Sequence, residues 1–411
     1  MKFEIITIGD ELLIGQVINT NAAWMGSELK SRGWDTVQVS VVPDQLDAIV
    51  TAFTLAFTRA DVVLVSGGIG PTKDDVTKRA LSQFYQTHLQ HDESVLQNIQ
   101  TLFAHRSLLL NELTRQQALV PAVAQIIQNK VGTAPCCWFE EYSKILVSLP
   151  GVPSEMKWLM SHEVLPRLEA KDADQAHILT HVLMVKDYTE SGLAEHLADI
   201  EEQLPNGFSL AYLPQPSIVR LRLTAKGKDL IALEGNLQKQ IELFRQRLQQ
   251  AIFAEKDLPL ACLVMERLKE RSLLLSTAES CTGGRIASMI TAIAGSSEVY
   301  TGSVVSYANE VKMGLLHVSE TDLQQHGAVS EPVVRQMAQG VAQACMSSCA
   351  VATSGIAGPS GGTPEKPVGT VWIAAYVEGK THARCFQFGT SREYNIQKAA
   401  NEALLMLLSM L

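Results

Sequence analysis

The stretch "AESCTGG", residues 278–284, contains an acid, a serine, a cysteine, a threonine and two glycines. An apolar run precedes it and a helical pattern follows, so we expect a strand-to-helix turn, where nucleophiles and anion-binding loops are commonly found. The turn lacks the G-x-S-x-G signature of hydrolases, and Cys281 has no histidine partner in an evident strand-end position. The residues expected to surround a phosphate or an oxyanion as hydrogen-bond donors are Ser280, Thr282, Gly283 and Gly284.

A second group of candidates lies in "AGSSEVYTGSVVSYANEVK", residues 294–312. Ser297 lies in a tight turn, Tyr307 ends the expected strand, and Lys312 follows within about one helical turn. A buried lysine can take the proton of a serine hydroxyl, because desolvation disfavours the ammonium form. A Ser–Lys pair with a tyrosine beside it could therefore perform acyl transfer without a histidine. An ordinary surface lysine is the alternative interpretation.

A long loop, "SGIAGPSGGTPEKPVG", residues 354–369, separates two apolar runs. Loops of this length in compact domains are commonly functional. The loop begins with Ser354 and Gly355, which we expect at the substrate. Arg392, near the start of the last expected helix, is a candidate for binding an anion, and exposure to solvent is its alternative.

The N-terminal part of the chain carries a different loop, "SGGIGPTKDDVTKRAL", residues 66–81. Its glycines let the backbone approach a ligand closely, and the helix that follows offers free N–H groups to a phosphate. Asp74 and Asp75 could hold a divalent metal such as Mg²⁺, or simply cap the helix. Asp44 and two acidic residues after the first expected strand would reach the same sheet edge. The expected phosphate ligands are Gly67, Gly68, Gly70 and Thr72, and the expected metal ligands are Asp44, Asp74 and Asp75.

The composition indicates a globular chain rather than a nucleic-acid or membrane binder. The 411 residues are 46% hydrophobic and 19% charged, and 34 basic against 43 acidic residues give a net charge of −9. No basic block is present, which argues against broad nucleic-acid contact. No segment approaches the length of about 18 apolar residues that a membrane span needs, and the N-terminus is not a signal peptide. Seven cysteines without a CxxC pair indicate free thiols in a reducing cytoplasm.

Expected strands and helices alternate along most of the chain, which is typical of an α/β protein with parallel sheets and helices on both faces. The length suggests two or three domains, which we place at 1–169, 170–257 and 258–411. The first and third are α/β layers, whose ligands bind beyond the carboxyl ends of the strands. The middle one is a small α+β unit without a cluster of catalytic residue types, in which "PSIVRLRLTAKG" alternates as a half-exposed strand does.

Together these stretches resemble the CinA family of bacterial competence/damage-inducible proteins. "IGDELLIGQVINTN", "GGIGPTKDD", "NKVGTAP" and "LPGVPSEM" are similar to its MogA/MoaB-like, molybdopterin-binding domain. "AESCTGG", "AGSS", "SYANEVK", "GAVSEPVV" and "SGIAGPSGGTPEKPVGTVWIA" are similar to its amidase domain. The resemblance covers essentially the whole chain and implies a KH-like fold for the middle domain. No GxxG loop is visible there, which argues against RNA binding by that domain.

The resemblance implies that the C-terminal domain hydrolyses nicotinamide mononucleotide to nicotinate mononucleotide and ammonia in pyridine-nucleotide recycling, without a cofactor. The family's serine–lysine arrangement falls on Ser297 as nucleophile and Lys312 as base, with Tyr307 alongside. The hydroxyl positions that line the family's site fall on Ser280 and Ser354 here, and the family often has Thr at the position of Ser354. The further residues expected at the substrate are Ser280, Ser354 and, for its phosphate, Arg392.

For the N-terminal domain, the resemblance implies a metal-dependent ADP-ribose pyrophosphatase as an alternative or additional activity. Asp44, Asp74 and Asp75 match the acidic positions of that motif. A non-enzymatic partner protein in DNA uptake or repair is a further alternative. The expected partners are small nucleotide substrates and a second copy of the chain in a homodimer, with neither nucleic acid nor membrane.

Overall fold

The protein is described by a computed structural model over residues 1–70, 76–105, 110–172 and 177–411. Contacts within the chain define two compact units, Met1–Leu179 with Ala225–Gly235, and Thr180–Thr224 with Asn236–Leu411. Within the described ranges, no helix has both the length and the apolar character needed to cross a membrane.

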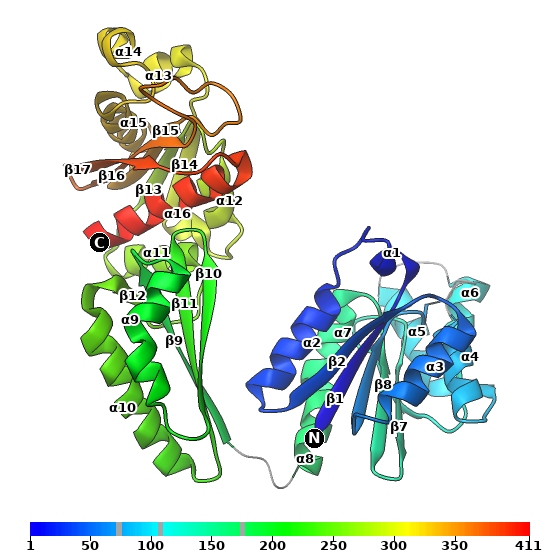
Figure 1. The fold of residues 1–411 in the computed structure, drawn as a ribbon. Helices are drawn as coiled ribbons and strands as arrows, with labels where there is room; N and C mark the ends of the chain where they lie inside the picture. Colours follow the sequence, from blue (N-terminus) through cyan, green and yellow to red (C-terminus); the bar gives the residue numbers. More distant parts are fainter. Residues whose placement is uncertain (71–75, 106–109, 173–176) are drawn as a thin grey trace. The chain divides into compact units, whose positions relative to one another are not determined.

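The N-terminal domain is built around a six-stranded sheet in the order β2-β1-β3-β8-β7-β6 (Figure 1). The strands are β1 (Lys2–Ile8), β2 (Asp35–Val42), β3 (Val62–Ser66), β6 (Gln125–Ile127), β7 (Cys136–Glu141) and β8 (Lys144–Leu149). The first four in the sheet order are parallel, as predicted, whereas β7 pairs antiparallel with both β8 and β6, so the sheet is mixed. Tyr142 and Ser143, at φ 48° and 63°, form the two-residue turn between β7 and β8. A connection this short can join only antiparallel neighbours.

Helices cover both faces of this sheet, because alternate residues of its strands point to opposite sides. Phe3 and Ile5 of β1 pack with one set of helices, and Ile6 and Ile8 pack with the other. The first set is α2 (Thr20–Ser31), α7 (Pro153–Leu159) and α8 (Leu165–Lys171), and the second is α3 (Leu46–Ala56) and α4 (Thr77–Phe84). The remaining elements are α1 (Asp10–Leu13), β4 (Leu89–His91), α5 (Glu93–His105), α6 (Glu112–Arg115) and β5 (Leu119–Pro121), with short helical turns at Gln116–Ala118 and Met160–Val164.

The middle domain is an α+β unit with a four-stranded sheet in the order β10-β11-β9-β12. Its elements are β9 (His177–Lys186), α9 (Glu190–Glu202), β10 (Phe208–Gln215), β11 (Ile218–Gly227), α10 (Leu230–Leu248), the turn Gln249–Ala251 and β12 (Ile252–Ala254). The alternation predicted for β11 is confirmed, since Val219, Leu221 and Leu223 are buried and the arginines between them are partly exposed. Val182, Met184 and Ile218 of this domain belong to the same hydrophobic cluster as the core of the C-terminal domain.

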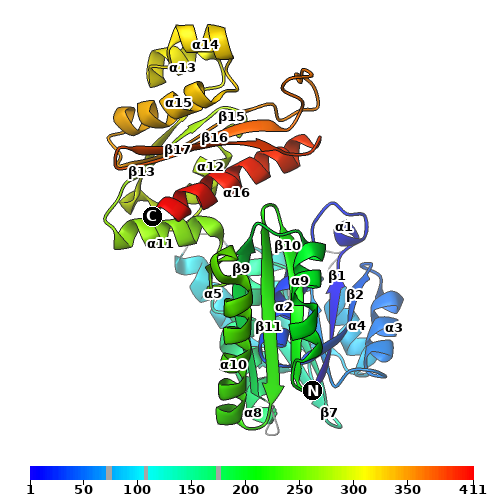
Figure 2. The same cartoon turned by 60° about the vertical axis from the view of Figure 1, so that its left-hand side comes forward.

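The C-terminal domain contains a five-stranded sheet in the order β14-β13-β15-β16-β17 (Figures 1 and 2). Its strands are β13 (Leu275–Glu279), β14 (Tyr300–Val305), β15 (Cys349–Gly355), β16 (Thr370–Val377) and β17 (Lys380–Gln387), of which the first three are parallel. One face packs on α11 (Leu260–Glu270), α12 (Arg285–Thr291) and α16 (Arg392–Met410). The other packs on α13 (Asn309–Leu316), α14 (Glu320–His326) and α15 (Glu331–Ala344).

Parallel pairing decides which segments of the C-terminal domain meet. Because β13, β14 and β15 run the same way, the residues that follow them lie at one edge of the sheet. Ser280 follows β13, Ser306 and Tyr307 follow β14, and the loop that opens at Gly355 follows β15. The short helical turn Ser296–Glu298 precedes β14 and therefore lies at the opposite edge.

Candidate active site

A serine–lysine pair lies at the carboxyl edge of the C-terminal sheet. Lys312, on α13, is 1% exposed, and its Nζ donates to the carbonyl oxygens of Ser306 (2.7 Å) and Tyr307 (3.4 Å) and lies 3.3 Å from Ser280 Oγ. Burial lowers the pKa of Lys312 below its ordinary value, because the ammonium form loses its hydration. The two carbonyls can only accept hydrogen bonds, whereas the Ser280 hydroxyl can also donate. An ammonium can donate to all three oxygens, and a neutral amine can keep the two carbonyl contacts and turn its lone pair toward the Ser280 O–H.

Ser297 does not belong to this pair, which corrects the sequence-based assignment. It is exposed and lies in the turn Ser296–Glu298, before β14, whereas Lys312 lies after β14. The six residues of β14 span roughly 20 Å at about 3.3 Å per residue. The chain leaves β13 at the site edge, returns through α12 to the opposite edge, and comes back through β14. The parallel arrangement therefore keeps Ser297 away from Lys312 and brings Ser280 to it.

Two further candidates meet beside this pair. Tyr307 is 65% exposed, and its hydroxyl accepts a hydrogen bond from Arg392 Nη2 at 3.4 Å. Nη1 of the same arginine donates to the Gly358 carbonyl at 2.9 Å, so the first residue of α16 reaches the loop that follows β15. Ser354 is 1% exposed, and its hydroxyl donates to the Ala328 carbonyl at 2.7 Å.

The C-terminal turn, residues 280–284, is closed by an acid that the sequence-based prediction missed. Glu279 is fully buried, and its carboxylate accepts from the backbone N–H groups of Gly284 (3.0 Å), Ile286 (3.1 Å) and Ala287 (2.8 Å). These are the free N–H groups of the α12 N-terminus that a bound anion would otherwise use. The local sequence carries no specific signal for such a cap, because an acid at the end of a buried strand can also face solvent or a ligand.

The other predicted donors of the C-terminal turn are also bonded within the protein. The Gly283 N–H donates to the Ser280 carbonyl at 3.2 Å. The Thr282 hydroxyl is 2.7 Å from the hydroxyl of Thr353 on β15. In this structure, Gly283, Gly284 and Thr282 therefore use these groups to shape the turn, and their contact with an anion stays a prediction. Ser280 is the predicted member of the motif that faces the lysine.

Cys281 lies inside the domain rather than at the site. Its side chain is 7% exposed, and burial raises the pKa of its thiol to about 12. A thiol with so high a pKa is protonated at neutral pH and is a poor nucleophile. This agrees with the sequence-based preference for a hydroxyl nucleophile over Cys281.

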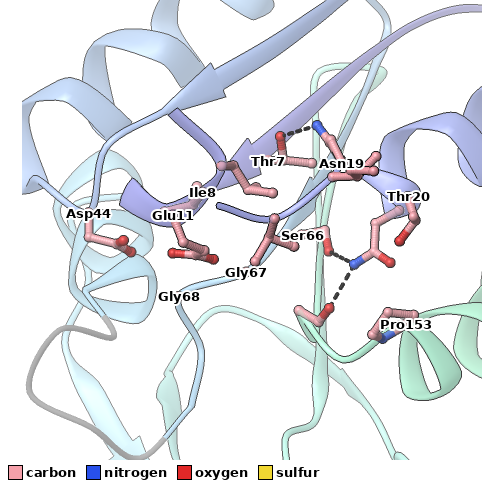
Figure 3. A pocket seen from close by; sticks show the side chains of 16 residues that line it. Thr7, Ile8, Glu11, Asn19, Thr20, Asp44, Ser66, Gly67, Gly68 and Pro153 are labelled. Atoms are coloured by element: carbon pink, nitrogen blue, oxygen red, sulfur yellow. Dashed lines mark hydrogen bonds between the residues drawn. The ribbon is translucent and has the colours of Figure 1, made fainter. Parts of the chain in front are cut away.

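The N-terminal domain has a separate cavity of about 350 Å³ beyond the carboxyl ends of β1 and β3 (Figure 3). The N-terminal turn, residues 66–70, supplies Gly67 and Gly68 to its wall. Gly67 has φ 109°, and a Cβ there would collide with the Ile8 carbonyl, so only glycine fits. The Asn21 amide donates to Ser66 Oγ (3.0 Å) and to the Gly151 carbonyl (2.8 Å), which holds two walls together.

Carboxylates lie at one end of this cavity. Figure 3 shows the side chains of Glu11 and Asp44 there, and both line the cavity. Asp44 Oδ2 also accepts from the backbone N–H of Asp10 at 3.0 Å. The acidic residues that follow β1 and β2 therefore lie together, as expected. Gly70 is the last residue of the first described range. Thr72, Asp74 and Asp75 lie outside the described residues, and within the described ranges no group of three His, Cys, Asp or Glu side chains is arranged to hold a metal ion.

Comparisons with known proteins cover the whole chain. Family models match at residues 4–170 ("Probable molybdopterin binding domain"), 180–254 ("Damage-inducible protein CinA KH domain") and 257–411 ("CinA C-terminal domain"). A CinA-like protein of Cytophaga hutchinsonii is 40% identical over 397 residues, which are 97% of this chain and 95% of the relative. One of Flavobacterium psychrophilum is 38% identical over 409 residues, 99% and 98% of the two chains. The crystal structure of CinA from Thermoplasma acidophilum, 35% identical, corresponds to 40% of this chain and 96% of that one, with a TM-score of 0.37.

Proposed function

This chain belongs to the CinA family, and we propose that its C-terminal domain is a nicotinamide-nucleotide amidase. It would hydrolyse nicotinamide mononucleotide to nicotinate mononucleotide and ammonia, the substrate that the family resemblance implies. The observation that carries the proposal is the contact between Ser280 Oγ and the buried Nζ of Lys312. A neutral lysine beside a serine hydroxyl is a nucleophile and base for acyl transfer.

The reaction follows from the hydrogen-bond roles in this pair. Lys312 Nζ takes the proton of Ser280, and Oγ forms a bond to the carboxamide carbon. When the tetrahedral intermediate collapses, the C–N bond breaks and the Lys312 proton passes to the leaving nitrogen, which departs as ammonia. Water then gives a proton to Lys312 and attacks the ester carbon. The C–O bond to Ser280 breaks, Oγ regains its proton, and the carboxylic acid product leaves.

Arg392 is the proposed ligand of the substrate phosphate. Its guanidinium has five N–H donors, and the contacts with the Gly358 carbonyl and the Tyr307 hydroxyl use only part of them. Guanidinium groups pair well with phosphate oxygens. Tyr307, largely exposed beside Arg392, would contact the substrate between its phosphate and its carboxamide. The reaction written above uses no cofactor.

Ammonia release from nicotinamide mononucleotide tests this proposal. The purified full-length chain should release one ammonia for each nicotinate mononucleotide formed, in the presence of a metal chelator. A sample that is folded by circular dichroism and that releases no ammonia would contradict the amidase function.

We propose a metal-dependent ADP-ribose pyrophosphatase as a second function, in the N-terminal domain. Its support is the cavity that combines Glu11 and Asp44 with the glycines of the N-terminal turn. Carboxylate oxygens suit Mg²⁺, which would neutralise the pyrophosphate, and Asp74 and Asp75 are the further expected ligands.

AMP formation from ADP-ribose tests the second function. It should require a divalent cation and fall about 100-fold in Asp44→Asn, with amidase activity unchanged. AMP formation that is unaffected by chelator and by this substitution would contradict it.

A further inference from the structure

Glu279 occupies the place at which the C-terminal turn could otherwise hold an anion. Its carboxylate accepts the backbone N–H groups of Gly284, Ile286 and Ala287, and Thr277 Oγ1 lies 3.4 Å from Oε1. The side chain has no exposed surface, so it does not touch a substrate. We propose that Glu279 is a positioning residue, which fixes the C-terminal turn so that Ser280 faces Lys312, and that it thereby sets the rate of acyl transfer.

The position of Glu279 in the chain supports this role. It is the last residue of β13 and directly precedes Ser280, and its carboxylate reaches over the turn to the start of α12. The turn is thus held at both ends, by sheet pairing of Glu279 with Thr353 and by three hydrogen bonds to α12. Charge-assisted hydrogen bonds of this kind are among the stronger ones in proteins. The contact between Ser280 and Lys312 at 3.3 Å depends on how this turn is held.

The same turn buries Cys281, which supplies a readout that does not depend on activity. Cys281 is 7% exposed, and Cys349, the first residue of β15, is fully buried at the opposite edge of the sheet. If the carboxylate fixes only the turn, its loss will expose Cys281 and leave Cys349 protected. If it stabilises the domain as a whole, both thiols will become accessible together. The exposed Cys385 serves as the labelling standard.

The test is Glu279→Gln in the full-length chain. The amide places an N–H group where the carboxylate accepted, so it cannot satisfy all three backbone donors. We expect kcat to fall about 100-fold with KM within about threefold, because a shift of about 1 Å at a nucleophile has an effect of this size. We also expect faster alkylation of Cys281, located by mass spectrometry, with Cys349 unchanged. Glu279→Asp, which keeps the charge on a shorter side chain, should recover part of kcat and of the protection.

The outcomes separate this inference from the proposed function on which its kinetic part rests. Equal labelling of Cys281 and Cys349 in both variants, or an unchanged kcat with Cys281 still protected, would overturn the role of Glu279. Wild-type protein without amidase activity would remove the proposed function, and the labelling pattern would still decide whether Glu279 holds the turn. Should Glu279→Gln fail to fold, the same two measurements on Glu279→Asp apply.

Discussion

The N-terminal turn and the C-terminal turn are alike in their place in the fold and in their glycines, but one lines a cavity and the other is closed by a side chain. Each follows a buried parallel strand, contains glycines and precedes a helix. The N-terminal turn lines an open cavity, whereas the N–H groups after the C-terminal turn are bonded to Glu279. The last residue of the strand makes the difference. Ser66 ends β3, and its hydroxyl donates to the Pro150 carbonyl and accepts from the amide of Asn21 on α2, whereas Glu279 bonds to the helix that follows its own turn.

The comparison shows that a glycine-rich turn after a strand does not by itself make an anion site. Its N–H groups are available only if no side chain of the protein takes them first. In the C-terminal domain the chemistry is therefore expected from the side chains of Ser280 and Lys312. In the N-terminal domain it is expected from the cavity that Gly67, Gly68 and the carboxylates of Glu11 and Asp44 line. Each prediction below tests one side of this contrast.

The largest effect is expected at the nucleophile. Ser280→Ala should lower kcat for nicotinamide mononucleotide about 1,000-fold or more, because it removes the hydroxyl that lies 3.3 Å from Lys312 Nζ. Ser297→Ala is the matched control, since it removes the same group from the opposite edge of the sheet, and kcat should stay within about twofold. Ammonia release measures both. Loss of activity in Ser297→Ala, with Ser280→Ala unaffected, would make Ser297 the nucleophile. It would also contradict the proposal that the chemistry comes from the side chain at the C-terminal turn.

The pH dependence of the amidase should follow the protonation of Lys312. Burial lowers the pKa of this lysine, and only the neutral amine can accept the serine proton. The rate should therefore rise with pH through the lowered pKa, falling about tenfold for each pH unit below it. The acidic limb of kcat should lie below the range of an ordinary lysine. A limb at the ordinary lysine value would show that Lys312 is solvated when the substrate is bound.

A smaller effect is expected from the loss of phosphate binding by Arg392. Arg392→Met should raise KM for nicotinamide mononucleotide about 10- to 100-fold, since a charged hydrogen-bonded contact is lost. The nucleoside without phosphate is the control substrate, and its KM should not change. If both substrates lose affinity equally, or neither does, the phosphate binds elsewhere. The C-terminal turn would then again be a candidate for the phosphate site.

The smallest effects are expected from glycines of the two turns. Gly283 has φ 58° and open space around its Cβ position, so Gly283→Ala should lower the free energy of unfolding by about 1 kcal/mol, with amidase activity nearly unchanged. Gly67→Ala should have the larger effect, because its Cβ meets the Ile8 carbonyl at the cavity wall. Urea unfolding and AMP formation measure these changes. Equal effects at both glycines would contradict the difference between the turns.

The sequence predicted most of the strands that carry the site and several of the residues at it. Residues that follow buried strands, such as Ser280 and Tyr307, were expected at a sheet edge, and the structure brings both to Lys312. The assignment of Ser297 rested on the family resemblance more than on the spacing of the residues. It conflicts with parallel pairing of β13 and β14, which the alternation of strands and helices had itself predicted. Topology was therefore the better guide to which serine reaches the lysine.

The role of Glu279 could not be predicted, because it depends on where the side chain of the last strand residue points. An acid at that position can face solvent, a ligand or the next helix, and the local sequence is the same in each case. The mixed sheet of the N-terminal domain is a similar example. Tyr142 and Ser143 are not the usual residues for a turn with positive φ, so the hairpin they form gave no clear signal.

The hydrophobic cluster shared by the middle and C-terminal domains affects how the chain can be divided. Val182, Met184 and Ile218 pack with residues of α11 and α16, and Asn401 of α16 donates to the Pro216 carbonyl at 2.8 Å. A fragment that begins at residue 258 would expose this apolar surface to water. Calorimetry should accordingly record a single cooperative transition for the middle and C-terminal domains. A fragment that carries the candidate active site would need to retain both domains to keep its heat of unfolding.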